Sequence, residues 1–215
     1  MTTGDIAGAK FDVQYGVAMK ALLFRATLFA CVLFVGLAPA SGQIQNGMHV
    51  APEGVRQAHA IGLALFSYAN DNNGDYPTGS SSTEVFQKLI DGGYVSDPAL
   101  FYVPMPGKVR PTTGKLKPEN VSFDVTAGVD LKSSDAVPIL FMTGFLVDYT
   151  VGSAAVPLTE DAKKRDGMVI FYHSNSTQFL IKDPNGTVRS AIPKAFDGKG
   201  HHYQQLTPDG PPGLV

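Results

Sequence analysis

The stretch from Val55 to Ala69, VRQAHAIGLALFSYA, decides the fold of this chain. Apolar residues recur along it at intervals of three and four, the spacing that places side chains on one face of an α-helix. These residues are Val55, Ala58, Ile61, Gly62, Leu65, Tyr68 and Ala69. The Asn72-Asn73-Gly74 segment that follows favours a helix end, because Asn and Gly adopt the left-handed cap conformation at little cost. The sequence therefore predicts an amphipathic helix over residues 55–69.

A second, shorter helix is predicted behind a capping box. In Ser81-Ser82-Thr83-Glu84 the Ser81 hydroxyl can accept from a free backbone N–H, and the Glu84 side chain can reach back to the chain before it. Residues 85–91 then place Phe86, Leu89 and Ile90 towards a core and end at a Gly pair. Asp97-Pro98 predicts a further helical turn, with Asp as the cap and Pro at the first position.

Beyond Val121 the apolar runs become short, which is typical of strands. The runs are 137–142 (VPILFM), 145–149 (FLVDY), 168–172 (MVIFY), 178–181 (QFLI) and 187–192. The polar segment 173–177 predicts a hairpin between the third and fourth runs. One helix, a small helical excursion and then antiparallel strands predict an α+β fold, in which a small antiparallel sheet covers the apolar stripe of the helix.

The N-terminal part of the chain has the pattern of an export signal. Residues 26–40, ATLFACVLFVGLAPA, carry no charge, follow Lys20 and Arg25, and end in the small residues Ala38-Pro39-Ala40. A spanning helix needs about 20 apolar residues, so a cleaved signal is favoured over a retained anchor. The retained alternative would tether the chain to the inner membrane through residues 22–40. The sequence thus predicts a periplasmic or extracellular protein, with residues 1–40 as an extension plus signal peptide or membrane anchor.

The remainder of the chain divides into three predicted parts. Residues 41–54 are expected to form a flexible leader, because Gly42, Gly47, Pro52 and Gly54 interrupt helix. Residues 55–200 are expected to form one globular domain, which is long enough to bury a core. Residues 201–215 are expected to be a loosely held tail.

Composition excludes several classes of function. The 215 residues include 17 basic and 19 acidic residues, with no basic block that would bind nucleic acid. The single Cys excludes an internal disulfide and a multi-cysteine zinc site. A Gly-rich phosphate loop, a nucleophile elbow and an HExxH motif are all missing from the sequence.

A few polar positions suggest chemistry, but each has a simpler interpretation. His173-Ser174 fits turn chemistry better than a catalytic pair, and His201-His202 fits an exposed polar tail better than a metal site. The segment from Asp71 to Asp75 resembles the start of a calcium loop, but Tyr76 and Ser82 stand where such a loop needs Gly and Glu. We therefore predict no catalytic, cofactor-binding or metal-binding residue, no cofactor and no enzymatic activity.

The segment from His59 to Pro77, HAIGLALFSYANDNNGDYP, resembles bacterial type IV pilin-like proteins and type II secretion pseudopilins. Weaker similarity extends over residues 55–181, through Gly93-Tyr94-Val95-Ser96-Asp97-Pro98 and a closing hairpin at residues 167–180. The matching residues of the first block are Ile61, Gly62, Leu63, Ala64, Leu65, Tyr68, Asp71, Asn72, Gly74, Tyr76 and Pro77.

The chain also departs from that family. The prepilin N-terminal motif is absent, since the fifth residue after Gly16 is Ala21 instead of Glu. The resemblance therefore implies a pilin-like globular domain carried by an ordinary export signal. It implies a non-enzymatic role through protein partners or self-assembly, in a secretion or surface assembly. The alternative from the residues alone is a small secreted hydrolase that uses His173 or His201-His202 with an Asp.

Overall fold

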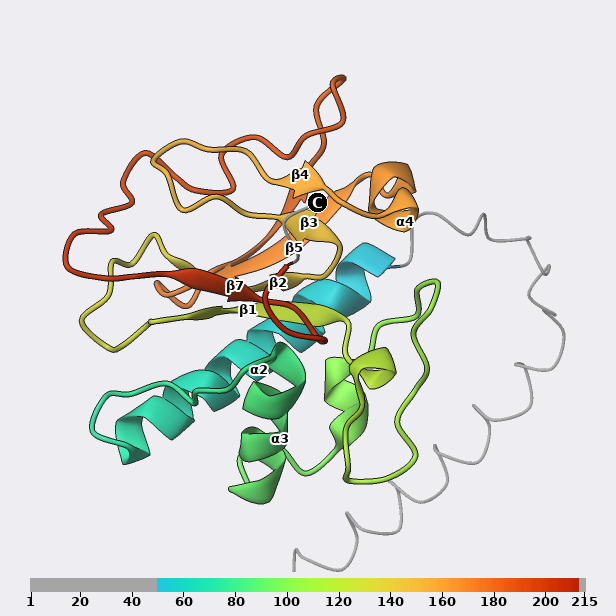
Figure 1. Ribbon diagram of the computed structural model, residues 1–215, viewed down its shortest axis with the longest axis vertical. Coiled ribbons are helices and arrows are strands. Elements are labelled where there is room, and N and C mark those ends of the chain that lie inside the picture. The colour runs from blue at the N-terminus through green and yellow to red at the C-terminus, as the bar shows by residue number, and fades with distance from the viewer. Residues whose placement is uncertain (1–49, 213–215) are drawn as a thin grey trace, which may run out of the picture. The chain divides into compact units, whose positions relative to one another are not determined.

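A five-stranded antiparallel sheet, with a long helix laid along it, forms the centre of the fold (Figure 1). The computed structural model describes residues 50–212 of the chain. The predicted signal or anchor at 1–40, leader residues 41–49 and tail residues 213–215 lie outside the described residues. The mixture of helices with an antiparallel sheet confirms the predicted α+β class.

The helical segments precede the strands along the chain, except for the short helix between the fourth and fifth strands. The α-helices are α2 (Val50–Asp71), α3 (Ser82–Asp91) and α4 (Glu160–Lys164), and the 3-10 turns are η2 (Pro98–Phe101) and η3 (Pro118–Asn120). The strands are β1 (Phe123–Ala127), β2 (Pro138–Met142), β3 (Phe145–Leu146), β4 (Val156–Pro157), β5 (Gly167–Tyr172), β6 (Thr177–Ile181) and β7 (Gln204–Leu206). The main sheet has the order β6-β5-β2-β1-β7, and β3 with β4 forms a separate pair.

The predicted helix over residues 55–69 is confirmed and is longer than expected. It begins at Val50, so the predicted flexible leader is wrong over residues 50–54. Pro52 is tolerated there because the first turn of a helix has no intrahelical partner for the backbone N–H. Gly54 faces the sheet, where a Cβ would lie 3.0 Å from Met142 Cε. Its small size therefore serves close packing.

Both predicted caps are confirmed. Ser81 Oγ accepts from Glu84 N at 3.2 Å and begins α3, while the Glu84 carboxylate accepts from Ser80 N at 2.8 Å. Asp97 Oδ1 accepts from Ala99 N at 2.9 Å and begins η2. Local side-chain chemistry thus fixes where these helical segments start.

The predicted hairpin around residues 173–177 is also confirmed, as antiparallel β5 and β6. The predicted strand at 187–192 is wrong, because that segment makes only an isolated bridge between Val188 and Ala155. The run at 145–149 forms a strand over its first two residues only. Backbone hydrogen bonds join residues 188 and 192 to the segment 152–155, among them Val188 N to Ala155 O at 2.9 Å and Gly152 N to Ile192 O at 3.0 Å.

The tail is not loose over its first part. Gln204–Leu206 form β7, which pairs with β1 at one edge of the sheet. The segment behind it is held by α3, since Ser82 N donates to Thr207 O at 2.9 Å and Thr83 Oγ1 donates to Pro208 O at 2.8 Å. The prediction of a loose tail failed because three residues of strand are too few to produce a recognisable alternation.

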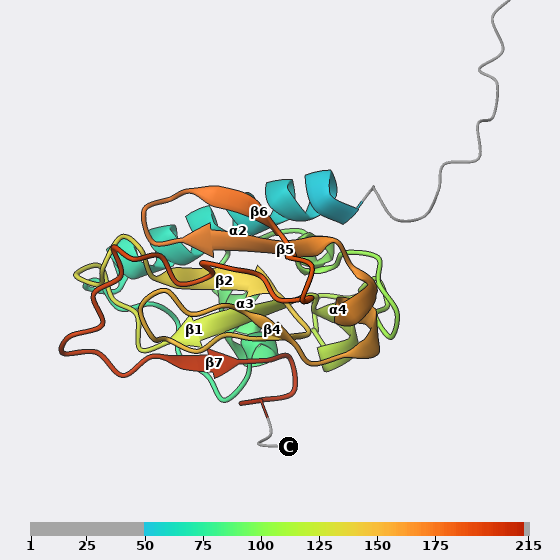
Figure 2. The same ribbon diagram turned by 90° about the horizontal axis from the view of Figure 1, so that it is seen from above.

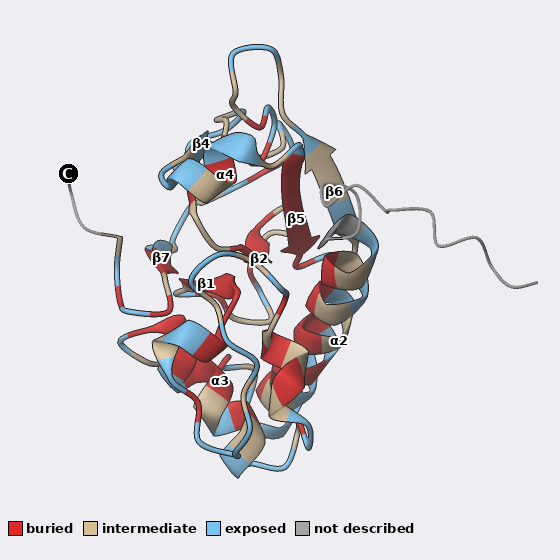
Figure 3. Cartoon of the chain, turned by 90° about the vertical axis from the view of Figure 1, so that its right-hand side faces the viewer, coloured by how far each residue is buried: buried red, intermediate tan, exposed pale blue. Residues whose placement is uncertain are grey.

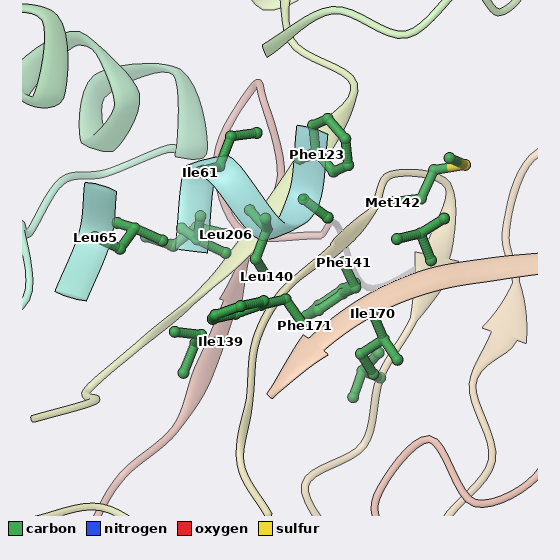
Figure 4. Packing of buried hydrophobic residues seen from close by; sticks show 14 of the residues in the cluster. Ile61, Leu65, Phe123, Ile139, Leu140, Phe141, Met142, Ile170, Phe171 and Leu206 are labelled. Carbon is green, nitrogen blue, oxygen red and sulfur yellow. The ribbon is translucent and has the colours of Figure 1, made fainter. Parts of the chain in front are cut away.

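One face of the main sheet is covered by α2 and α3, which lie below it in Figure 1. Figure 4 shows Ile61 and Leu65 of α2 against Leu140 and Phe171 of the sheet. A Cβ at Gly62 would lie 2.3 Å from the Phe171 ring, so glycine is what lets the helix approach this closely. This face is apolar throughout its centre.

The opposite face is covered by loops, the β3–β4 pair and α4 (Figure 2). Its buried polar side chains include Asp124 of β1 and Gln205 of β7. Gln205 Nε2 donates to Asp124 Oδ2 and to Phe145 O, both at 2.7 Å, and Gln205 Oε1 accepts from Val147 N at 3.0 Å. A side-chain network therefore ties the β3 segment to the sheet.

No helix within residues 50–212 is long and apolar enough to cross a membrane.

Candidate interaction surface

The outward side of α2 carries two large apolar side chains that nothing among the described residues covers completely. Leu63 is 42% exposed and Phe66 is 40% exposed. They share one stripe of the helix with exposed Arg56, His59 and Asn70, because these positions repeat at intervals of three and four. In Figure 3 the helix shows this division along its length, with a buried stripe against the sheet and an exposed stripe outside.

Strand β6 runs beside α2 and forms the outer edge of the sheet (Figure 2). Tyr172 N donates to Ser176 O at 2.9 Å, and Lys182 N donates to Asp166 O at 2.7 Å. In an antiparallel pair the hydrogen-bonded positions alternate, so the odd-numbered residues of β6 turn their N–H and C=O groups away from β5. No strand among residues 50–212 pairs with those groups.

The side chains of β6 give this edge little protection against pairing. Its sequence, TQFLI, contains neither proline nor a charged residue, the usual devices that blunt an edge strand. Ile181 is 73% exposed at its end, and Thr177 is joined to α2 through a 3.2 Å contact between its Oγ1 and His59 Nδ1. We define the candidate interaction surface as the outer edge of β6 together with Leu63 and Phe66.

His173, a candidate base in the hydrolase alternative, lies buried where β5 turns into β6. Its Nδ1 is 3.8 Å from Asp135 Oδ1, and its ring lies 6.1 Å from that of Tyr76. Burial lowers the pKa of His173, and the carboxylates of Asp135 and Asp130 oppose that effect. Neither ring nitrogen has a hydrogen-bond partner among the described residues, so no nucleophile within that part of the chain is placed for His173 to activate.

The other polar positions singled out in the sequence serve local structure. His201 stacks on Tyr203 with ring centroids 5.3 Å apart, and His202 is exposed beside it. Asn73 and Gly74 have positive φ angles and close the end of α2, where Gly74 N donates to Ala69 O at 2.8 Å. Within residues 50–212 no three His, Cys, Asp or Glu side chains are grouped closely enough to hold a metal ion.

Sequence reasoning located α2 but missed the surface. The periodicity that predicts the buried stripe also places Leu63 and Phe66 outside it, so the helical part was available from the sequence. The edge position of β6 was not, because strand order depends on how β2 and β7 pair with residues distant in sequence.

No protein-family model, curated protein or solved structure matches this chain.

Proposed function

We propose that this chain is an exported, non-enzymatic protein whose pilin-like or pseudopilin-like domain acts through protein–protein contacts. The observation that carries the proposal is the unpaired, uncharged edge of β6 beside the exposed apolar residues of α2. A sheet edge of this kind supplies backbone hydrogen bonds to an incoming strand, and neighbouring apolar side chains add buried area. The predicted role is in a secretion or surface assembly, with a protein partner or another copy of the chain.

Two further features agree with a pilin-like arrangement. An N-terminal helix lies along an antiparallel sheet, and the closing hairpin of β5 and β6 contacts that helix. The exported location rests on the residue pattern at 1–40.

Site-specific photo-crosslinking in the native cell tests the contact surface. A crosslinking residue at position 66 or 181 is expected to give a discrete higher-mass product. Position 109 is the matched control, because Val109 is 59% exposed and belongs to the loop between η2 and η3 instead of to α2 or β6. Equal crosslinking at position 109 would contradict the proposed surface.

A proline substitution distinguishes backbone pairing at the β6 edge from nonspecific contact by apolar side chains. The Ile181 N–H points away from β5, so Ile181→Pro removes an outward donor while leaving the β5–β6 ladder in place. We expect Ile181→Pro to abolish the crosslink from position 66 and Ile181→Thr, which retains the N–H, to preserve it. Loss with both variants would mean that the side chain, and not the backbone edge, makes the contact.

Export is tested separately by cell fractionation and by the mass of the mature chain. A periplasmic or extracellular protein whose sequence begins after Ala40 is expected. A protein found only in the cytosol would overturn the proposed function.

A further inference from the structure

The side chains of β6 alternate between the two faces of the sheet, and the register of its ladder with β5 fixes which side chain lies where. Thr177 pairs with Phe171 and Phe179 pairs with Val169, two β5 residues whose side chains face the glycines of α2. Ile181 continues the same alternation. These three side chains therefore lie on the helix-covered face, while their backbone N–H and C=O groups point outwards from the edge.

The outward edge of β6 is symmetric about Phe179. A second copy of β6, laid antiparallel about a two-fold axis at Phe179, places Phe179 opposite itself and Thr177 opposite Ile181 at both ends. The outward backbone groups of all three residues are then paired, since opposite residues at these positions exchange both N–H···O bonds. The two Phe179 side chains meet on the axis, and aromatic side chains directly opposite one another stabilise a sheet.

The same placement brings the exposed apolar side chain of the edge to that of the helix. In Figure 3 β6 lies beside α2, and the Thr177 end of the strand is next to His59, with Thr177 Oγ1 3.2 Å from His59 Nδ1. Leu63 follows His59 by one helical turn on the same exposed stripe. Ile181 of the second copy, opposite Thr177, therefore arrives at the end of the edge where Leu63 is exposed.

Charges on the loop-covered face are complementary in this arrangement. Lys182 follows β6 and points to that face, where its Nζ donates to Ala162 O at 3.3 Å. Asp135 lies at the other end of the edge, where it lines a pocket with Ser176, and its side chain is 89% exposed. The two-fold register places Lys182 of the second copy opposite Ser176, on the side of the sheet where Asp135 lies. A parallel copy in the same register would instead bring the two Lys182 side chains together.

We propose that two copies of the chain pair through β6, antiparallel and about a two-fold axis at Phe179, into one continuous sheet with five strands from each copy. This inference rests on the proposed function and names the partner as a second copy of the chain. Each β6 edge is used once in such a closed arrangement, so pairing through β6 ends at two copies.

Disulfide trapping tests the register. Cys31 is the single cysteine of the sequence, so the full chain with Cys31→Ala contains only the cysteines that are introduced. Residues opposite each other at a hydrogen-bonded position have Cα atoms about 5.5 Å apart, within the range that a disulfide spans. Oxidation of Thr177→Cys mixed with Ile181→Cys is therefore expected to give a covalent dimer. Each variant alone is expected to give none, because identical positions other than 179 are not opposite each other.

Gln178→Cys mixed with Ile181→Cys is the matched control, because position 178 faces the other side of the sheet and should not be trapped. Equal trapping in this control, or a disulfide from Ile181→Cys alone, would overturn the two-fold register.

Sedimentation measures the association without any crosslink. The wild-type chain is expected to have the mass of a dimer. Ile181→Asp places a charge beside Leu63 of the second copy and should weaken dimerisation by about tenfold or more, with an unchanged circular dichroism spectrum. Val151→Asp, at a 56% exposed apolar position outside α2 and β6, should leave dimerisation unchanged. A monomeric wild type, or undiminished dimerisation in Ile181→Asp, would overturn the inference.

Failure of this inference is distinguishable from failure of the proposed function. A monomeric chain whose products from positions 66 and 181 in the cell contain a different protein would reject the second copy as the partner and leave the proposed function in place. Crosslinking at these positions no stronger than at position 109 would contradict the proposed function itself.

Discussion

The two faces of the main sheet are buried by different means. On the helix-covered face, contact is made by apolar side chains and by glycines that allow α2 to approach closely. On the loop-covered face, the buried layer includes a carboxyl, an amide and hydroxyls, because irregular segments bring backbone groups that need hydrogen-bond partners. The first face is specified by shape, and the second is specified by hydrogen bonding.

The largest expected effect concerns the pH dependence of the loop-covered face. The folded pKa of Asp124 is about 7 and its unfolded value is about 3.9. The folded state binds this proton more tightly, so its contribution is fully present below pH 4 and is lost as pH rises through 7. The free energy of unfolding should fall by up to about 4 kcal/mol from this residue over that interval.

Urea denaturation of the wild type and Asp124→Asn across this pH range measures the effect. The difference in unfolding free energy between the two should grow steadily in favour of the variant as pH rises. Other carboxyls, such as that of Asp183, have lowered pKa values and give the opposite slope in both proteins, so they cancel in the difference. A constant difference would show that Asp124 does not hold its proton in the folded state.

A smaller effect on stability is expected on the helix-covered face, where the packing of apolar side chains dominates. Gly62→Ala places a methyl group against the Phe171 ring, and overpacking of this kind costs about 1–3 kcal/mol. The same change in a Phe171→Ala background should be neutral or stabilising, because the space is then open and Ala favours helix. Thermal and urea unfolding of the wild type, the two single variants and the double variant gives the coupling free energy between positions 62 and 171. Equal costs in both backgrounds would rule out steric contact as the reason for glycine.

The smallest effect tests a single hydroxyl on the loop-covered face. Thr126 Oγ1 lies 2.7 Å from Tyr149 OH and also donates to Pro138 O. Thr126→Val keeps the shape but removes both bonds, and it should lower the unfolding free energy by about 1–2 kcal/mol. Thr150→Val, at an exposed position nearby, should change it by less than about 0.5 kcal/mol. If the two variants behave alike, the buried Thr126 hydroxyl contributes no more to stability than an exposed one.

The same contrast explains what could be predicted from the sequence. The apolar period of α2, the Ser81 cap and the β5–β6 hairpin are local patterns, and all three are confirmed. Asp124 and Gln205 are 81 residues apart, and no local signal joins them. The edge position of β6 and the existence of β7 likewise depend on pairing between distant segments, so the candidate interaction surface emerges only in three dimensions.

The late position of β7 in the chain has a consequence for biosynthesis. Residues 204–206 complete the sheet beside β1, and the residues just after them hold α3. During translation β1 is therefore left with an open edge until most of the polypeptide has emerged from the ribosome. The export signal proposed for residues 26–40 would therefore be synthesised well before the strand that completes the sheet.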